Sequence, residues 1–176
     1  MKYCNIIGKG SSLRKIDFSK LKGYTFGVNN VDMIVDVNEV VAWDKTEPVT
    51  DKPINTLTVR NYGNAKYLNK GKGINRNIGE VANYNSSVCM AINIALNRGF
   101  DTLFLFGVDQ KIINGVYNVF GQKMNKCDAE EMFRLFDRFY REMKADLREN
   151  EKIYTVGESA APFANITFEE YQKMTL

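Results

Sequence analysis

Short apolar runs alternate along the chain with polar, glycine-bearing segments, and this alternation indicates an α/β fold. The runs that predict strands are residues 3–7, 24–28, 39–43, 54–59, 101–110 and 152–156. The run DTLFLFGVDQ, residues 101–110, is typical of a central parallel strand that is covered on both faces. Parallel strands need crossover connections, which are mostly helical. The sequence therefore predicts one Rossmann-like α/β domain, residues 1–176, with a mostly parallel sheet and helices on both faces.

Apolar residues at helical spacing and suitable capping residues predict two of the helices. The first follows Ser86 or Ser87, either of which can act as the N-cap, and Gly99 comes directly after its end. The second spans residues 167–174 at the end of the chain, with Thr167 as its N-cap.

The longest helix is predicted over residues 128–149, where Asp128 and Glu131 resemble a capping box. We interpret the apolar residues on one face of this helix as a core stripe, because a stripe at this spacing normally packs on the domain core. They are Phe133, Phe136, Tyr140, Met143 and Leu147.

Small and polar residues follow the ends of the predicted strands. They are Gly8, Lys9, Gly10, Ser11 and Ser12, then Asn29 and Asn30, Asp44, Arg60 and Asn61, and Asp109. If the strands are parallel, all of them face the crevice in which such sheets bind ligands. A left-handed turn at Asn29 and a capping role for Asp109 are the alternatives.

The segment GKGSS, residues 8–12, can be a phosphate cradle or only a tight turn. It lacks the third glycine of a dinucleotide fingerprint and the Gly-Lys-Ser/Thr of a Walker loop. Glycines let the backbone approach a ligand, and free N–H groups at a helix start favour an anion. For a cradle, we expect Gly10→Val to abolish nucleotide binding and to leave the fold largely intact.

Composition narrows the function further. The chain has 176 residues, 44% of them hydrophobic, and a net charge of +3, which is too weak and too evenly spread to indicate nucleic-acid binding. It has no run of 18 apolar residues and no apolar segment typical of a signal peptide, so we expect no membrane span. The three cysteines match no zinc pattern, and an odd number of them fits a cytoplasmic location.

Four segments, in order, resemble the bacterial sialyltransferases that build lipooligosaccharide. They are IIGKGSSLRKIDFSKL, TFGVNN, NSSVCMAINIALNRGFDTLFLFGVDQ and KIYTVGESAAPFANI, between residues 6 and 166. The same outline is similar to a wider Rossmann superfamily that includes motility accessory factors and 6-hydroxymethylpterin diphosphokinase-like proteins. The resemblance implies a site for a nucleotide or a nucleotide sugar with a CMP-type donor.

The resemblance also implies roles for individual residues. The glycine segment would lie against the phosphate and sugar, Asn29 would contact the ribose or base, and Asp109 would lie at the crevice floor. Tyr117 would hold the phosphate. The full expected nucleotide-binding set is Gly8, Lys9, Gly10, Ser11, Ser12, Asn29, Asn30, Arg60, Asn61, Ser86, Ser87, Tyr117, Gly157 and Ser159.

The chain departs from the family pattern at residues that would contact the ligand or carry out the reaction. Lys9 stands where the family has asparagine, and the chain has no histidine, whereas the family uses one as its catalytic base. A base is still needed to activate an acceptor hydroxyl, and Asp109, Asp44 or Glu80 could serve with a raised pKa. Of these, Asp109 and Asp44 are the candidate catalytic residues, and the sequence does not choose between them. No dedicated metal site is predicted.

Three functions therefore stay open. The first is a glycosyltransferase-like protein with a CMP-type donor site, and the second is a non-catalytic nucleotide-binding protein, for which a phage origin is one alternative. The third is a Mg²⁺-dependent pyrophosphoryl transferase like the pterin diphosphokinases, with Asp44 and Asp109 as metal ligands. The expected partner is a small nucleotide, and a homo-oligomer is an open alternative.

Overall fold

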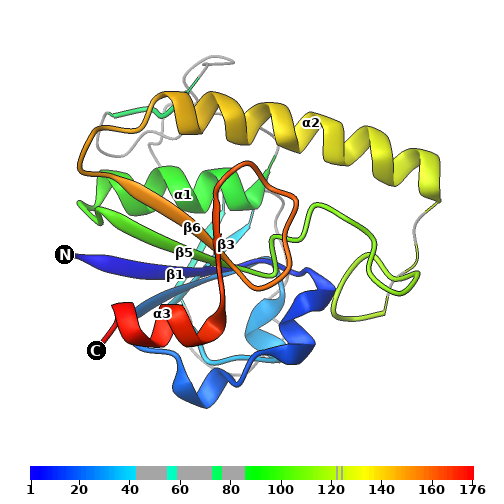
Figure 1. Ribbon diagram of the computed structural model, residues 1–176, viewed down its shortest axis with the longest axis horizontal. Helices are drawn as coiled ribbons and strands as arrows, with labels where there is room; N and C mark the ends of the chain where they lie inside the picture. The colour runs from blue at the N-terminus through cyan, green and yellow to red at the C-terminus, as the bar shows by residue number, and fades with distance from the viewer. Residues whose placement is uncertain (43–54, 59–72, 77–85, 122, 124) are drawn as a thin grey trace.

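The computed structural model describes residues 1–42, 55–58, 73–76, 86–121, 123 and 125–176. Their strands form one sheet in the order β4-β3-β2-β1-β5-β6-β7, and every described strand pair is parallel (Figure 1). The predicted α/β fold with a parallel sheet is therefore confirmed. The strands are β1 (Tyr3–Ile7), β2 (Tyr24–Val28), β3 (Glu39–Ala42), β4 (Asn55–Thr58), β5 (Thr102–Phe106), β6 (Lys152–Val156) and β7 (Ala164–Ile166).

Six of these strands fall on the predicted apolar runs, and two details differ. Strand β5 stops at Phe106, because Gly107 adopts a φ of +60° and turns the chain out of the sheet. Strand β7 was not predicted. It has three residues, two of them exposed, so no apolar run marks it in the sequence.

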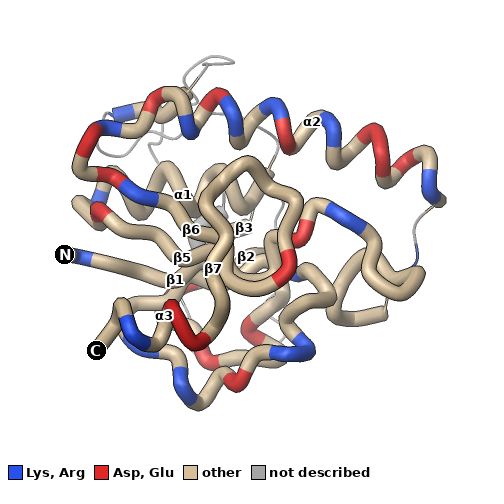
Figure 2. The backbone as a smooth tube through the Cα atoms, in the orientation of Figure 1, with Lys and Arg blue, Asp and Glu red and all other residues tan. Residues whose placement is uncertain are grey.

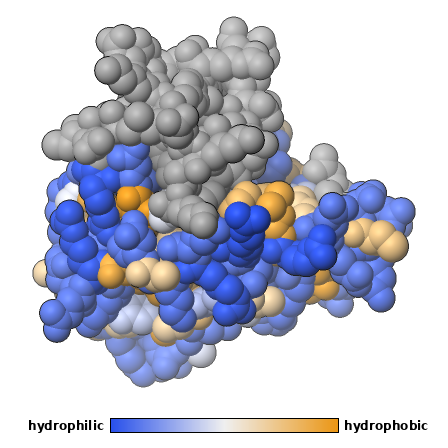
Figure 3. All heavy atoms as spheres, turned by 90° about the horizontal axis from the view of Figure 1, so that it is seen from above, coloured by the Kyte–Doolittle hydropathy of each residue, from blue (hydrophilic) through white to orange (hydrophobic). Residues whose placement is uncertain are grey.

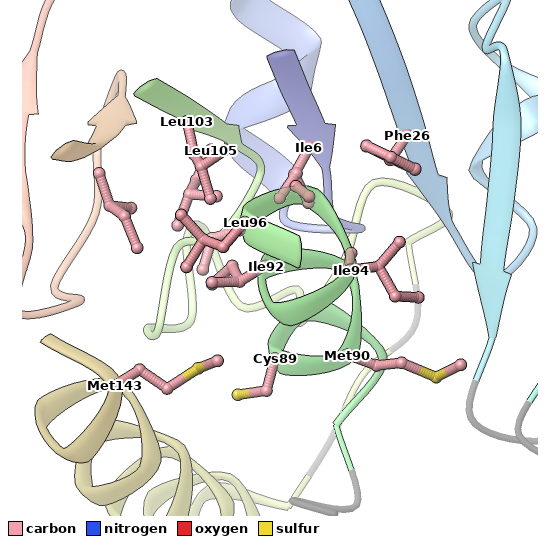
Figure 4. Packing of buried hydrophobic residues seen from close by; sticks show 14 of the residues in the cluster. Ile6, Phe26, Cys89, Met90, Ile92, Ile94, Leu96, Leu103, Leu105 and Met143 are labelled. Carbon is pink, nitrogen blue, oxygen red and sulfur yellow. The ribbon is translucent and has the colours of Figure 1, made fainter. Parts of the chain in front are cut away.

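Helices α1 (Ser87–Asn97) and α2 (Lys126–Ala145) cover one face of the sheet. Side chains that alternate along the central strands meet both helices in one buried cluster, so this face holds the larger part of the core (Figure 4). The cluster includes Ile6, Phe26, Leu103 and Leu105 from the sheet, Cys89, Ile92 and Ile94 from α1, and Met143 from α2.

The opposite face is covered by the short helix α3 (Phe168–Met174) and by 3-10 helices, including η1 (Ser11–Lys15). Tyr171 of α3 is fully buried. Its ring meets Phe104 and Phe106 edge-on, with centroid distances of 5.0 and 5.1 Å. The aromatic residues of β5 therefore fix the position of α3 on the sheet.

The side chains that act as N-caps determine where the three described α-helices begin. Ser86 caps α1 by accepting a hydrogen bond from the Cys89 amide, which is one of the two predicted alternatives. Thr167 caps α3 as predicted, in a reciprocal capping box. The capping box predicted at Asp128 is wrong. Asn125 caps α2 by accepting from the Cys127 amide at 3.0 Å, so α2 begins earlier and also ends earlier than predicted.

Helix α2 is amphipathic. Basic and acidic residues alternate along it, and some of them pair one turn apart (Figure 2). Seen from the α2 side, the described surface is mostly hydrophilic, with small groups of apolar side chains (Figure 3). Within the described residues, no helix combines the length and the apolar character that crossing a bilayer requires.

Candidate functional site

A pocket of about 240 Å³ lies at the carboxyl ends of the central strands. The chain runs from β1 outward to β4 on one side, and helix α1 then returns it to β5 on the other side of β1. The β1–β5 boundary is therefore the switch point at which open α/β sheets bind ligands. The pocket is lined by the loops after β1 and β5, the end of β2, the start of α1 and part of α2.

Seven of the residues expected from the sequence line this pocket: Lys9, Gly10, Asn29, Ser86, Ser87, Asp109 and Tyr117. Six expected residues lie elsewhere: Gly8, Ser11, Ser12, Asn30, Gly157 and Ser159. Four candidates, Asp44, Glu80, Arg60 and Asn61, lie outside the described residues.

The glycine segment is a tight turn, and the cradle prediction is wrong for three of its amides. The amide of Gly8 donates to the Phe106 carbonyl at 2.8 Å, and that of Gly10 donates to the Gly107 carbonyl at 2.7 Å. The amide of Ser12 donates to Asp109 Oδ2 at 2.9 Å, and the Ser12 hydroxyl donates to Oδ1 of the same carboxylate. These N–H groups are therefore not available to an anion.

Close packing of two loops explains the glycines. A Cβ on Gly8 would lie 2.6 Å from the carbonyl oxygen of Gly107, and one on Gly10 would lie 2.4 Å from Asp109 Cγ. Both distances are too short for any side chain. The glycines therefore let the loop after β1 pack on the loop after β5, and Gly10→Val would disturb the fold itself, contrary to our expectation.

Asp109 is the carboxylate that lies at the pocket floor. It is 4% exposed, and burial raises its pKa above the ordinary value, although the hydrogen bonds from Ser12 oppose this rise. Both carboxylate oxygens accept from Ser12. In this arrangement Asp109 holds the loop after β1 in place, and these hydrogen bonds come from Ser12 and not from the segment that follows Asp109, which is where a capping role was expected.

The raised pKa of Asp109 predicts a pH dependence. The folded state keeps the proton at a pH where the unfolded chain, with an ordinary pKa of 3.8, has lost it. The free energy of unfolding should therefore fall as the pH rises from about 4 through the folded-state pKa, by up to ~1.4 kcal/mol per pH unit. Asp109→Asn removes this titration. Urea unfolding of both proteins across this range measures the difference, and a difference independent of pH would contradict the prediction.

Two lysines bring positive charge to the pocket. The side chain of Lys9 is half-buried, burial lowers its pKa, and its ammonium makes no hydrogen bond or ion pair with any described residue. Lys111 also lines the pocket, and its Nζ lies 3.3 Å from Oε2 of Glu158, with which it forms an ion pair. Among the described residues that line the pocket, Asp109 is the only carboxylate. The lining therefore carries a cation that a bound anion would pair with.

Asn29 and Ser87 meet where α1 begins. Asn29 has a φ of +58°, which is the left-handed turn predicted as one alternative, and its Oδ1 accepts from Ser87 Oγ at 2.9 Å. Asn30 points away from the pocket, toward the sulfur of Met33. The strand end after β2 therefore contributes one of its two asparagines to the site.

Gly157 and Ser159 support the site from outside. The Ser159 hydroxyl donates to the Val108 carbonyl at 2.6 Å, and the Gly157 amide donates to the Ile166 carbonyl at 2.9 Å. Gly157 and Ser12 instead border a separate surface hollow beside α3. Ser159 therefore holds the turn after β6 against the end of β5, the Gly157 bond joins that turn to β7, and neither residue lines the pocket.

Sequence reasoning missed the apolar wall of the pocket. Met132, Phe133 and Phe136 of α2 line it, together with Val88 of α1. The ring of Phe133 lies 6.4 Å from that of Tyr117, which comes from the loop after β5. Because Phe133 and Phe136 continue the apolar stripe of α2, their spacing gave no sign that they face a pocket.

No family model matches the chain, and neither a curated protein nor a solved structure matches it. The resemblance to the sialyltransferases therefore depends on the sequence segments alone.

Proposed function

We propose that the protein binds a mononucleotide or a CMP-type nucleotide sugar in the switch-point pocket, with the anionic group beside Lys9. The observation that carries this proposal is the half-buried Lys9 ammonium, which forms no ion pair or hydrogen bond with a described residue. The start of α1 adds to it. This 11-residue helix directs the positive end of its dipole toward the pocket through Ser86 and Ser87.

The size of the pocket supports a compact ligand. Its volume of about 240 Å³ is below the roughly 300–1,000 Å³ of ordinary small-molecule sites. A single nucleotide unit suits this space better than a dinucleotide does. The resemblance to proteins with a CMP-type donor supports the same class of ligand.

Glycosyl transfer from a bound nucleotide sugar is the second candidate function, and Asp109 is the observation that favours it. A buried carboxyl with a raised pKa is the kind of group that acts as a general base. To accept a proton from an acceptor hydroxyl, Asp109 would have to share with that hydroxyl an oxygen that already accepts from Ser12. Simple binding makes no such demand on Asp109, and we therefore rank it first.

A Mg²⁺-dependent pyrophosphoryl transferase has less support. Asp44 lies outside the described residues, and both oxygens of Asp109 already accept hydrogen bonds from Ser12. For the cellular location, we retain the cytoplasm as a proposal. All three thiols, those of Cys4, Cys89 and Cys127, are unpaired, which suits a reducing compartment.

Lys9→Met tests the proposed function. Hydrogen bonds to charged groups contribute about 1.5–3 kcal/mol, so the variant should bind the nucleotide roughly ten- to a hundredfold more weakly. Thermal shifts with CMP, CDP, UDP, ATP and GTP, with and without Mg²⁺, identify the ligand, because binding to the folded state alone raises the melting temperature. Titration calorimetry then compares the variants.

Lys20→Met is the matched control, since Lys20 is exposed and lies outside the pocket lining. It should bind like the wild type. Equal affinity of Lys9→Met and the wild type, or the absence of a thermal shift with every nucleotide, would end the proposal. A shift with ATP that requires Mg²⁺ would favour the pyrophosphoryl transferase instead.

A further inference from the structure

The first half of α2 extends beyond the sheet. A helix of 20 residues is about 30 Å long, whereas a strand of five residues spans about 17 Å. Because α2 follows the carboxyl end of β5 and runs back along the sheet, the excess of roughly 13 Å lies at the carboxyl edge. Figure 1 shows this end of α2 projecting past the strands. We call residues 126–136 the overhang.

Burial along α2 changes where the overhang ends. Tyr140 and Met143, in the second half, are fully buried in the core cluster. In the overhang only Ala129 is buried, and Leu135 is 43% exposed. The overhang therefore covers the space beyond the strand ends, where the pocket lies.

The overhang presents a wall of a single chemical type to the pocket. Met132, Phe133 and Phe136 line it from this side, and all three are half-buried. Lys9 and Lys111 come from the opposite side, on the loops that follow the strands. The pocket thus has one apolar, largely aromatic wall on the side of α2 and, on the side of the loops, the ammonium of Lys9, which is unpaired among the described residues.

We propose that the overhang wall of Met132, Phe133 and Phe136 holds the aromatic base of the ligand and determines which ligands bind. This inference rests on the proposed function, since it assigns the base of the nucleotide whose anionic group lies beside Lys9. An aromatic ring can stack on phenylalanine and displace water from a wall that has no polar group to offer. A sugar phosphate without a base would leave the same wall facing water.

Binding to the wild type and to ring variants tests the wall. Calorimetry is done with CMP, AMP, cytidine and ribose 5-phosphate on the wild type, Phe133→Leu and Phe136→Leu. Leucine keeps most of the apolar volume and removes the flat ring. Loss of base stacking on one aromatic side chain commonly weakens binding by about tenfold. Each variant should therefore bind the preferred nucleotide with roughly tenfold lower affinity. Ribose 5-phosphate should bind the wild type more weakly than the nucleotide, and its affinity should not change in the variants.

Phe139→Leu is the matched control, because Phe139 lies on the same helix, packs on the core and does not line the pocket. Its affinity for the nucleotide should equal that of the wild type. If ribose 5-phosphate binds as tightly as the nucleotide, or if the ring variants lose no more affinity than the control, the assigned wall is wrong while the anion site at Lys9 stands. If none of the four ligands binds, the proposed function fails and the inference fails with it.

Discussion

Tyr171→Ala is expected to lower the free energy of unfolding by about 4 kcal/mol, since removal of a large buried aromatic side chain commonly costs ~3–5 kcal/mol. Tyr171 is fully buried, and it makes the closest contacts between α3 and the aromatic rings of β5, to which Phe168 adds a longer one. The truncation would leave a cavity between α3 and the sheet. Urea denaturation followed by circular dichroism measures the change.

Tyr171→Phe separates packing from hydrogen bonding. The Tyr171 hydroxyl accepts from the Lys22 amide at 3.0 Å and donates to the Lys22 carbonyl at 3.2 Å. Without these two bonds the phenylalanine variant should lose only about 1–2 kcal/mol. Equal losses in the two variants would show that the ring does not hold α3 on this face.

Gly10→Ala is expected to cost about 3 kcal/mol in the free energy of unfolding, from overpacking of ~1–3 kcal/mol and weakened hydrogen bonds to a buried carboxylate. The backbone at Gly10 has a φ of −60°, which any residue adopts, so the cost does not come from the conformation. It comes from the new Cβ, which would lie 2.4 Å from Asp109 Cγ and push the carboxylate away from Ser12. Thermal and urea unfolding measure it.

Gly115→Ala is the matched control for this prediction. Gly115 has a φ of +73°, and no atom of the described residues lies within 4 Å of the place that a methyl group would take there. Alanine should therefore cost only about 1–2 kcal/mol of backbone strain at this position. Replacing Asp109 by alanine should remove most of the additional cost at Gly10, because the two residues contact each other. Additive effects of Gly10→Ala and Asp109→Ala would contradict the proposed clash.

Much of the fold could be predicted because its strands are buried on both faces. A five-residue strand that is buried along its whole length, such as β5, is mostly apolar, and that leaves a run that is visible in the sequence. The edge strand β7 carries no such requirement. The predicted start of α2 lies too late because Asp128 and Asn125 are both good N-caps, and spacing alone does not choose between them.

The sequence predicted where the candidate pocket lies, but it predicted only some of the contacts between the residues that line it. The strand-end rule brought Lys9, Asn29 and Asp109 to one pocket, as expected. The hydrogen bond from the Ser12 amide to the Asp109 carboxylate joins residues that are 97 positions apart. No local sequence pattern shows that Asp109 accepts from this amide. Phe133 and Met143 share one helical stripe, and only the length of the sheet decides that one faces a pocket and the other the core.

The parallel order of the sheet also has a consequence for how the chain reaches its native state. The central strand β1 pairs with β5, so that Tyr3 lies opposite Thr102. During synthesis, β1 therefore cannot pair with β5 until roughly a hundred further residues have been made. Closing so long a loop is slow, because chain entropy is lost before the contacts that compensate for it can form. We therefore expect β1 to pair with β2, which lies about twenty residues further along the chain, before it pairs with β5.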